Sequence, residues 1–304
     1  MFRLLHLDMA KLCSLSYLNQ NQLQENFTQP EENTNMEAPY NSVLQKCKKC
    51  PELITGDYDA EAIITQYQEN SNTLHLANNL EHNTESNNND NNSQEQYLSI
   101  VFRGTESKTD IFTDLKLFQV FLELPTDYYE YENLPLVHQG FYQQFMSLKP
   151  QVENHIEKYI QHNQQNKIVF AGHSLGGALA TISALYFSYQ YPDLLISCIT
   201  LGSPRVGDSL FVQLFNQRIP QSYRYVNDND PVPCLPTSWR FAHVKGLQWL
   251  HEDEIKNEIM VWRFYRFCKN TVLDWFGYGY NPLQDHSCLE YIQDLHTIHK
   301  KFPC

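Results

Sequence analysis

Short apolar runs and longer amphipathic stretches alternate along most of the chain. Apolar runs of strand length occupy positions 60–67, 97–103, 167–171, 194–201, 222–226 and 239–244. Apolar residues with helical spacing occupy positions 1–18, 140–161, a segment ending near 191, 209–218 and 285–300. Strand and helix units that alternate in this way predict an α/β fold, in which a mostly parallel central sheet is flanked by helices on both faces.

Two polar stretches interrupt this pattern. Residues 19–59 are rich in Gln, Asn, Glu and Pro, and we predict that they form an irregular polar insertion. Residues 78–96 are Asn-rich and low in complexity, which predicts a solvated flexible loop that joins two strands as an enlarged hairpin. Because no internal repeat or second apolar core is evident, we predict that residues 1–304 form a single domain.

The composition is that of a globular, acidic protein. Hydrophobic residues make up 42% of the chain and aromatic residues 13%, which excludes a disordered chain. The formal charge of −13, from 22 basic and 35 acidic residues, argues against nucleic-acid binding and against electrostatic docking on anionic membranes. No apolar run reaches the roughly 18 residues of a membrane-spanning helix, so no transmembrane segment is expected. The composition does not indicate an oligomeric state.

The N-terminus and the cysteines bear on the compartment. His6, Asp8 and Lys11 interrupt the apolar run that a secretory signal needs, so we expect a cytoplasmic protein without a disulfide framework. Cys47 and Cys50 form a lone C-x-x-C, whose role stays open because a four-thiolate zinc site needs a second pair. No loop has the spaced oxygen ligands of a calcium site, and neither a metal nor a cofactor is expected.

The candidate chemistry centres on the segment Gly-His-Ser-Leu-Gly at residues 172–176, which directly follows the apolar run 167–171. A G-x-S-x-G segment between a strand and a helix holds its serine on a sharp turn, with the hydroxyl exposed above the sheet. Gly172 and Gly176 flank the turn where a side chain would collide with the neighbouring backbone. Ser174 is therefore the candidate nucleophile, and the segment predicts an α/β-hydrolase fold.

A serine nucleophile needs a histidine base that is steadied by a carboxylate, and hydrolases of this fold carry the three in the order serine, acid, histidine. Asp230 is the favoured acid because it follows the apolar run 222–226 and precedes Pro231, which stiffens the loop. Spacing alone leaves Asp228 and Asp208 open as alternatives.

His286 is the favoured base because it lies late in the chain, at a junction between a loop and the last helix. His173 lies within the serine segment itself and is expected to point away from the solvent side of the serine. The other rivals lie beside predicted turns or on the last helix, and they are His138, His243, His296 and His299.

The negative oxygen that develops during ester cleavage needs preorganised hydrogen-bond donors. One donor is the backbone N–H of Leu175, the residue after the nucleophile. The apolar run 97–103 is followed by Gly104 and Thr105. Thr105 can offer both an N–H and a hydroxyl as the second donor.

Six segments in this order resemble those of the class 3 lipases, the family that includes the filamentous-fungal triacylglycerol lipases. The segments are residues 101–105, 137–141, 172–177, 202–208, 226–236 and 285–287. Their order and spacing fit the family over roughly residues 97–300, whereas the two polar stretches and the missing signal depart from its compact secreted members.

The resemblance implies a role for each candidate. It implies a triad of Ser174, Asp230 and His286, with Asp230 preferred to Asp228, and an oxyanion hole of Thr105 and Leu175. It also implies a lid after Thr105, with an apolar face that is buried when closed and meets lipid when open. The apolar lid residues, which would also contact substrate, include Ile111, Phe112, Leu115 and Phe118. Aromatic residues between 262 and 280 are expected mainly to pack in the core.

We therefore predict a cofactor-free serine ester hydrolase, a lipase that cleaves acylglycerols through an acyl-enzyme on Ser174. Its partners would be a lipid ester substrate and, transiently, a lipid interface. A phospholipase A-type enzyme or a short-chain carboxylesterase would use the same triad and stays an alternative. A prediction of another class is a catalytically silent lipid-binding or interaction protein on the same scaffold.

Overall fold

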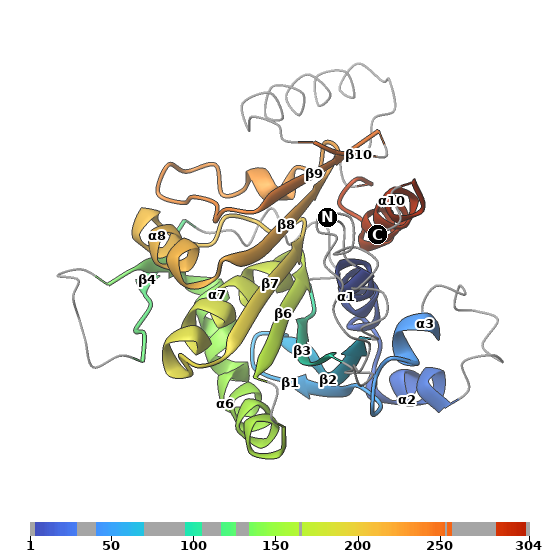
Figure 1. Cartoon of the computed structure of the whole chain (residues 1–304). Helices are drawn as coiled ribbons and strands as arrows, with labels where there is room; N and C mark the ends of the chain where they lie inside the picture. Colours follow the sequence, from blue (N-terminus) through green and yellow to red (C-terminus); the bar gives the residue numbers. More distant parts are fainter. Residues whose placement is uncertain are drawn as a thin grey trace, which may run out of the picture.

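A computed structural model describes residues 4–28, 41–69, 95–104, 117–125, 134–163, 166–252, 254–256 and 284–301 (Figure 1). Within these residues, strands form one large sheet in the spatial order β1-β2-β3-β6-β7-β8-β9-β10. The strands are β1 (Glu52–Thr55), β2 (Glu61–Glu69), β3 (Glu95–Phe102), β6 (Lys167–His173), β7 (Leu195–Leu201), β8 (Gln221–Asn227), β9 (Leu247–His251) and β10 (Glu254–Lys256).

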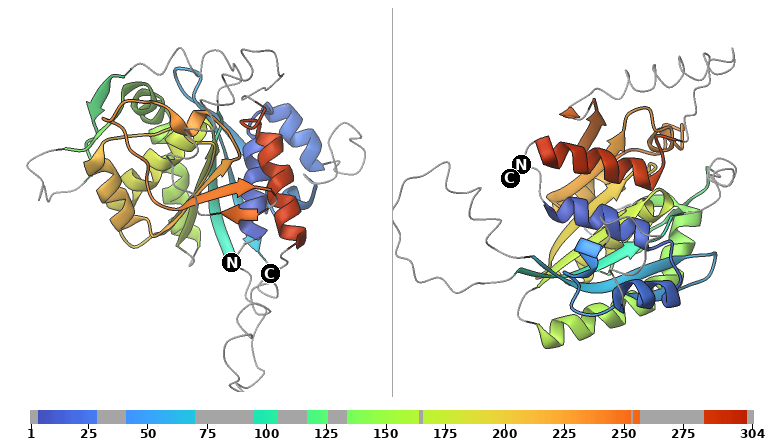
Figure 2. Two further views of the ribbon diagram at one scale, coloured as in Figure 1. Left: turned by 90° about the horizontal axis from the view of Figure 1, so that it is seen from above. Right: turned by 90° about the vertical axis from the view of Figure 1, so that its right-hand side faces the viewer.

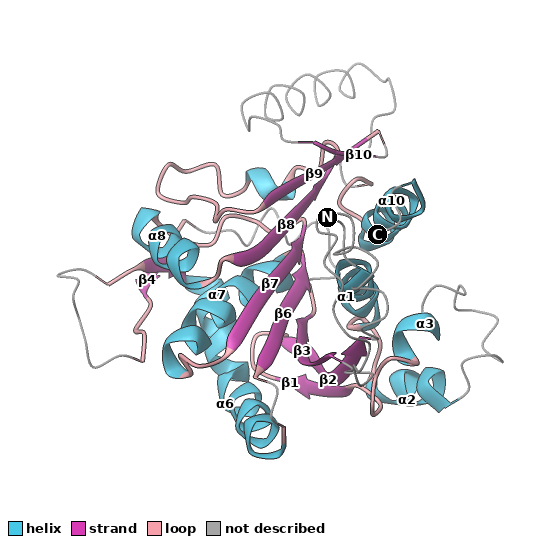
Figure 3. Ribbon diagram, in the orientation of Figure 1, coloured by secondary structure: helices cyan, strands magenta, loops and turns pink. Residues whose placement is uncertain are grey.

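The centre of this sheet is parallel and its edges are antiparallel. Strands β3, β6, β7, β8 and β9 pair in parallel, whereas β1 with β2, β2 with β3, and β9 with β10 pair antiparallel. A smaller sheet joins β4 (Gln119–Phe121) to β5 (Leu136–His138). A mostly parallel sheet with helices against it confirms the predicted α/β-hydrolase class (Figure 3).

Helices cover both faces of the large sheet. One face carries α6 (Gln139–His162), α7 (Leu175–Gln190) and α8 (Ser209–Arg218). The other carries α1 (Leu4–Leu15) and α10 (Cys288–Lys301), which lie side by side (Figure 2). The right-hand view of Figure 2 shows these two helices, drawn in blue and red, on the same side of the strands.

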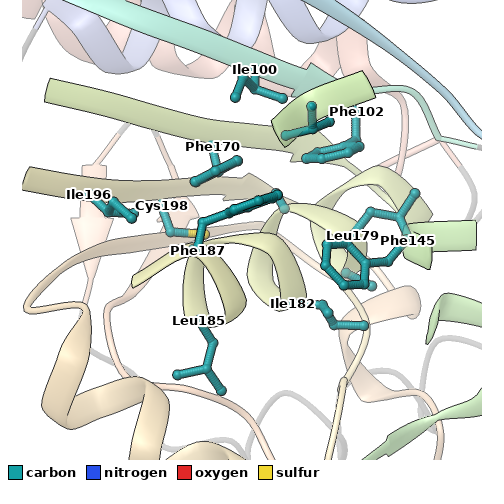
Figure 4. Close-up of a cluster of buried hydrophobic side chains, with 14 of the residues drawn as sticks. Ile100, Phe102, Phe145, Phe170, Leu179, Ile182, Leu185, Phe187, Ile196 and Cys198 are labelled. Atoms are coloured by element: carbon teal, nitrogen blue, oxygen red, sulfur yellow. The ribbon is translucent and has the colours of Figure 1, made fainter. Parts of the chain in front are cut away.

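Strand β6 shows why the sheet needs two helical layers. Its successive side chains alternate between the faces, so that Ile168 and Phe170 pack toward α7, whereas Val169 and Ala171 pack toward α1. All four are fully buried, as expected for a central parallel strand. Figure 4 shows the layer on the α7 side, where Phe170 stacks on Phe187 with ring centroids 5.8 Å apart. The nucleophile segment therefore follows a strand that is buried on both faces.

The stretch 19–59, which its composition predicts to be irregular, contains α2 (Gln20–Thr28), α3 (Asn41–Leu44) and β1. Helix α2 begins with reciprocal capping: the Gln22 backbone N–H donates to Asn19 Oδ1, and the Asn19 N–H donates to Gln22 Oε1. The fully buried Leu23 then anchors α2 to the core. Local capping and one buried leucine therefore order this part of a polar segment. Composition alone does not predict that order.

The strand predicted over residues 239–244 is wrong. Trp239 is 90% exposed, the Phe241 N–H closes a turn on Ser238, and Ala242 makes only an isolated bridge to Gly207. The strand next to β8 is β9, a few residues later, because its Trp249 and Leu250 can bury their side chains there. The apolar residues 239–244 thus form a turn and a loop instead of a strand.

Strands β2 and β3 pair antiparallel, from Glu69 opposite Glu95 to Ala62 opposite Phe102. Residues 78–94 of the predicted Asn-rich loop lie outside the described residues, so the flexible loop stays a prediction there. Its last two residues, Glu95 and Gln96, belong to β3. No helix within the described part of the chain is long and apolar enough to cross a membrane.

Candidate active site

Ser174 occupies the turn between β6 and α7. Its backbone has φ 56° and ψ −126°, a left-handed conformation that costs a non-glycine residue about 1–3 kcal/mol. A Cβ on Gly172 would lie 2.2 Å from the Gly176 carbonyl oxygen, and a Cβ on Gly176 would lie 2.2 Å from the Phe102 carbonyl oxygen. Both glycines are therefore required by close backbone approach, as the sequence predicts for this turn.

Ser174, His286 and Asp230 lie in one line of hydrogen bonds. The Ser174 Oγ lies 2.8 Å from His286 Nε2, and His286 Nδ1 lies 2.9 Å from Asp230 Oδ2 and 3.0 Å from Oδ1. A carboxylate only accepts, so Nδ1 carries the proton and Nε2 is free to accept the serine proton. Ser174 and Asp230 are each 1% exposed and His286 is 5% exposed, so this path is shielded from water.

The chain brings these residues together from two strand ends and from the turn before the last helix. Asp230 follows β8, His286 lies just before α10, and Ser174 follows β6. This is the arrangement expected of an open α/β sheet, where the crevice lies at the carboxyl ends of the strands.

The Asp230 carboxylate is oriented by two further donors. The Val232 N–H donates to Oδ1 at 2.9 Å, and the Tyr291 hydroxyl donates to Oδ2 at 2.6 Å. The same Tyr291 hydroxyl accepts the Asn227 N–H at 2.9 Å and so ties the end of β8 to α10. Tyr291 was missed in the sequence, because a tyrosine within an amphipathic helix carries no signal for a partner beyond its own helix.

The two rival acids have structural partners away from the serine. Asp228 pairs with His251, at 2.7 Å between Oδ1 and Nδ1. Asp208 caps α8, where its Oδ1 accepts the Phe211 N–H at 2.8 Å. The structure thus brings Asp230, and not these two, to the histidine.

The rival histidines also have other surroundings. His138 packs against Phe141, and His243 Nε2 lies 2.6 Å from the Pro233 carbonyl oxygen. His296 and His299 lie on α10, where Lys11 is among the charged neighbours of both. His173 is buried behind the site, and its Nε2 lies 2.7 Å from the His286 carbonyl oxygen.

The other predicted site residues are only partly described. Leu175 is the first residue of α7 and follows Ser174 directly. Phe118 is 65% exposed and precedes β4, close to the exposed Phe121. Thr105, Ile111, Phe112 and Leu115 lie outside the described residues, as do the aromatic residues between 262 and 280, so their roles stay predictions.

Strand β3 nevertheless leads the chain toward Ser174. It pairs with β6 up to Phe102 opposite Gly172. A Cβ on Gly104 would lie 2.6 Å from the His173 carbonyl oxygen and 3.2 Å from Ser174 Cβ. The residue before Thr105 therefore packs directly against the serine turn.

Burial sets the charge states near the site. Desolvation, followed by the neighbouring His286, lowers the pKa of His173 to about 3, so this imidazole stays neutral. Burial and then the nearby Asp228 raise the pKa of Asp285 to about 6. Among the residues that the structure describes, no group of three His, Cys, Asp or Glu side chains is arranged to hold a metal ion.

Such an arrangement is suited to acyl transfer. A buried imidazole that accepts a serine proton, with a carboxylate fixing its tautomer, generates an alkoxide-like nucleophile without a cofactor. The backbone N–H of Leu175, at the N-terminal end of α7, is suited to binding a developing oxyanion.

Comparison with known proteins agrees with this geometry. Residues 99–239 match the family model described as lipase (class 3). The chain is 34% identical over 126 residues to secreted mono- and diacylglycerol lipase 1 of Fusarium solani. This alignment covers 41% of this chain and 37% of that protein. It is 26% identical over 128 residues to secreted mono- and diacylglycerol lipase MDL2 of Malassezia globosa, covering 41% of each. The matches thus span about two fifths of these relatives.

A solved structure extends the likeness to the whole fold. The triacylglyceride lipase of Rhizomucor miehei superposes with a TM-score of 0.61 at 20% identity, over 92% of this chain and 91% of that one. At this identity the match supports the shared fold.

The expected cytoplasmic location is contradicted by these relatives, which are secreted lipases in both Fusarium and Malassezia. The expectation rested on His6, Asp8 and Lys11, which interrupt an apolar run. These residues belong to the packed helix α1, in which His6 and Asp8 are each 2% exposed, so they reflect packing in the fold and not targeting.

Proposed function

Because residues 99–239 match the family model of the class 3 lipases, we propose that this protein is a serine ester hydrolase that cleaves acylglycerols. The observation that carries the proposal is the buried path of hydrogen bonds from Ser174 through His286 to Asp230, with distances of 2.8 and 2.9 Å. Relatives named as mono- and diacylglycerol lipases support the substrate class.

The reaction would proceed in two acyl transfers. His286 Nε2 takes the Ser174 proton as Oγ attacks the ester carbonyl, and the resulting oxyanion binds the Leu175 N–H and the predicted donor Thr105. The imidazolium, paired with the Asp230 carboxylate, gives its proton to the departing glycerol oxygen. Water, activated by the same imidazole, then attacks the acyl-enzyme and releases the fatty acid while Ser174 Oγ regains its proton.

Phospholipids and short-chain esters are the alternative substrates, because the same three residues would cleave them. A silent lipid-binding protein is the alternative of another class. The strained backbone of Ser174 argues against this alternative. Its conformation costs about 1–3 kcal/mol, which is without purpose unless the hydroxyl must be presented to a substrate.

The test is to replace the nucleophile. Ser174→Ala should lower the turnover of p-nitrophenyl esters about 10⁴-fold or more, because no other group forms the acyl-enzyme. Ser183→Ala, at a buried serine further along α7, is the matched control and should keep its turnover. A fluorophosphonate probe should label the wild type and the control, but not the alanine variant at position 174.

Full turnover in Ser174→Ala would overturn the nucleophile, and an unlabelled but folded wild type would favour the silent alternative. A series of acyl chain lengths, measured with and without a lipid–water interface, separates a lipase from a short-chain esterase. Glycerophospholipid hydrolysis in the same assay tests the phospholipase alternative.

A further inference from the structure

His286 is held by its main chain as well as by its ring. Its carbonyl oxygen accepts a hydrogen bond from His173 Nε2 at 2.7 Å, and the two imidazole rings lie against each other with centroids 4.7 Å apart. His173 is the residue before Ser174, so this bond links the turn of the nucleophile to the turn of the base. The distance between Oγ and Nε2 therefore depends on the orientation of His173.

The second nitrogen of His173 is bonded to Tyr17. The Tyr17 hydroxyl lies 3.0 Å from His173 Nδ1. A carbonyl oxygen only accepts, so Nε2 must carry the proton, Nδ1 must accept, and the Tyr17 hydroxyl must donate. Tyr17 thus selects the tautomer of His173 that can hold the His286 carbonyl.

Both groups keep the protonation that this path needs. Burial lowers the pKa of His173 to about 3, and burial raises the pKa of the Tyr17 phenol. The bonds from Tyr17 to His173 and on to His286 are therefore intact throughout the pH range in which esters are assayed.

Tyr17 is itself fixed in place by the end of β3. The Arg103 guanidinium lies 5.5 Å from the centroid of the Tyr17 ring and forms an ion pair with Glu61. A Cβ on Gly104 would lie 2.5 Å from the Tyr17 hydroxyl, so the main chain passes directly beside it. Tyr17 comes just after α1, and the N-terminal helix therefore ends at the strand that leads to Thr105.

We propose that Tyr17 and His173 form a positioning pair that holds the His286 turn in register with Ser174. Neither residue exchanges a proton with substrate; Tyr17 acts only through His173, and His173 acts on His286. The proposal rests on the proposed function, because it assigns these residues to the reaction of that same triad.

Tyr17→Phe is the main test, because phenylalanine keeps the ring and its contact with Arg103 and removes only the hydroxyl. We expect kcat on a soluble p-nitrophenyl ester to fall about 10-fold with KM unchanged, as for the loss of one hydrogen bond that matters in the transition state. Tyr159→Phe is the matched control, because this buried tyrosine donates to the Gln96 carbonyl, near the other end of β3, and should keep its kcat.

Substitutions at His173 test the second link. His173→Leu should lower kcat about 100-fold, since a displacement of about 1 Å in a catalytic group costs that much. His173→Gln, whose amide reaches about as far as Nε2 and can still donate to the His286 carbonyl, should recover most of this loss. In the double variant, Tyr17→Phe should add nothing to His173→Leu, because the hydroxyl acts only through the imidazole.

The results separate this proposal from the proposed function. Thermal unfolding of each variant first gives the temperature at which all are folded, and rates are compared there. If the wild type is active and labelled by fluorophosphonate but Tyr17→Phe keeps the wild-type kcat, or His173→Leu loses less than 3-fold, the positioning role is refuted and the function stands. If the losses of kcat in the double variant were additive, the two residues would act independently through packing, and the positioning pair would also be refuted. If the folded wild type is neither active nor labelled, both proposals fail together.

Discussion

Ser174 and His286 face each other across 2.8 Å, yet the molecule positions them in different ways. Ser174 is placed by its own neighbours: strand β6, two glycines that permit close backbone contact, and helix α7 form one continuous segment. His286 lies on a short turn before α10, and its partners Asp230 and His173 come from the loop after β8 and from β6, while Tyr291 of α10 holds Asp230 in turn. The nucleophile is therefore encoded locally, whereas the base depends on contacts between distant segments.

This difference has a consequence for substitutions. A change at Gly172 or Gly176 of the serine segment disturbs the backbone of the central sheet and should appear first as a loss of stability. A change around His286 removes one of several side-chain contacts and should appear first as a loss of rate while the fold persists.

Among the changes around His286, the largest effect should come from the carboxylate that fixes its ring. Asp230→Asn should lower kcat/KM about 10³–10⁴-fold, because an amide no longer stabilises the imidazolium and can favour the wrong tautomer of His286. Ester hydrolysis of the folded variant measures the loss. Asp228→Asn, at the rival acid that pairs with His251, is the control and should lose less than about 10-fold. Equal losses in both variants would mean that the acid was assigned wrongly.

A glycine substitution tests whether Ser174 is positioned by its own neighbours in the chain. Gly176→Ala would place a Cβ 2.2 Å from the Phe102 carbonyl oxygen, a clash with backbone that cannot rotate away, and should lower the free energy of unfolding by about 3 kcal/mol. Gly140→Ala on α6 is the matched control, because its Cβ would meet only the His138 ring, at 3.3 Å, and alanine favours a helix by about 1 kcal/mol. Urea unfolding measures both. A Gly176→Ala protein as stable as the wild type would contradict local placement of the serine.

The same contrast explains what could be predicted from the sequence. The serine segment carries its geometry in five consecutive residues, so the strand, the turn and the helix after it follow from the pattern alone. Asp230 and His286 are identifiable only by chain order and by resemblance to a family, because spacing leaves Asp228 open. The helix and strand pattern of the central parallel sheet was predictable for a similar reason, since strands such as β6 are apolar on both faces.

The features that were missed depend on partners distant in the chain. Tyr17 and Tyr291 look like ordinary aromatic residues of two amphipathic helical segments, and only the packing of α1 beside α10 brings them to the site. Edge strand β1 is short, and an isolated four-residue segment carries too little periodicity to be distinguished from a loop. The strand predicted over residues 239–244 is wrong for a different reason. Its apolar composition suggests a buried strand but does not reveal which side chains face solvent.

The smallest predicted effect concerns Asp285, the residue directly before His286, and it tests the contacts between distant segments that position the base. Asp285 accepts the Asn229 N–H at 3.2 Å, and burial together with Asp228 raises its pKa from 3.8 to about 6. The folded state therefore binds this proton more tightly than the unfolded chain does. The stabilisation is complete below pH 3.8 and is lost as the pH rises through 6.

Asp285→Asn removes this titration and keeps an oxygen that can accept the Asn229 N–H. At pH 8 the variant should be more stable than the wild type by about 1 kcal/mol, a figure reduced from the full shift because the carboxylate is partly exposed to solvent. The difference should shrink as the pH falls from 7 to 4, which urea unfolding at several pH values measures. Asp193→Asn, at an exposed aspartate before β7, should show no such trend. If the wild type instead gained stability relative to Asp285→Asn with rising pH, the Asp285 carboxylate would be stabilising the His286 turn as an anion, and the turn would then depend on charge as well as on the neutral contacts from His173.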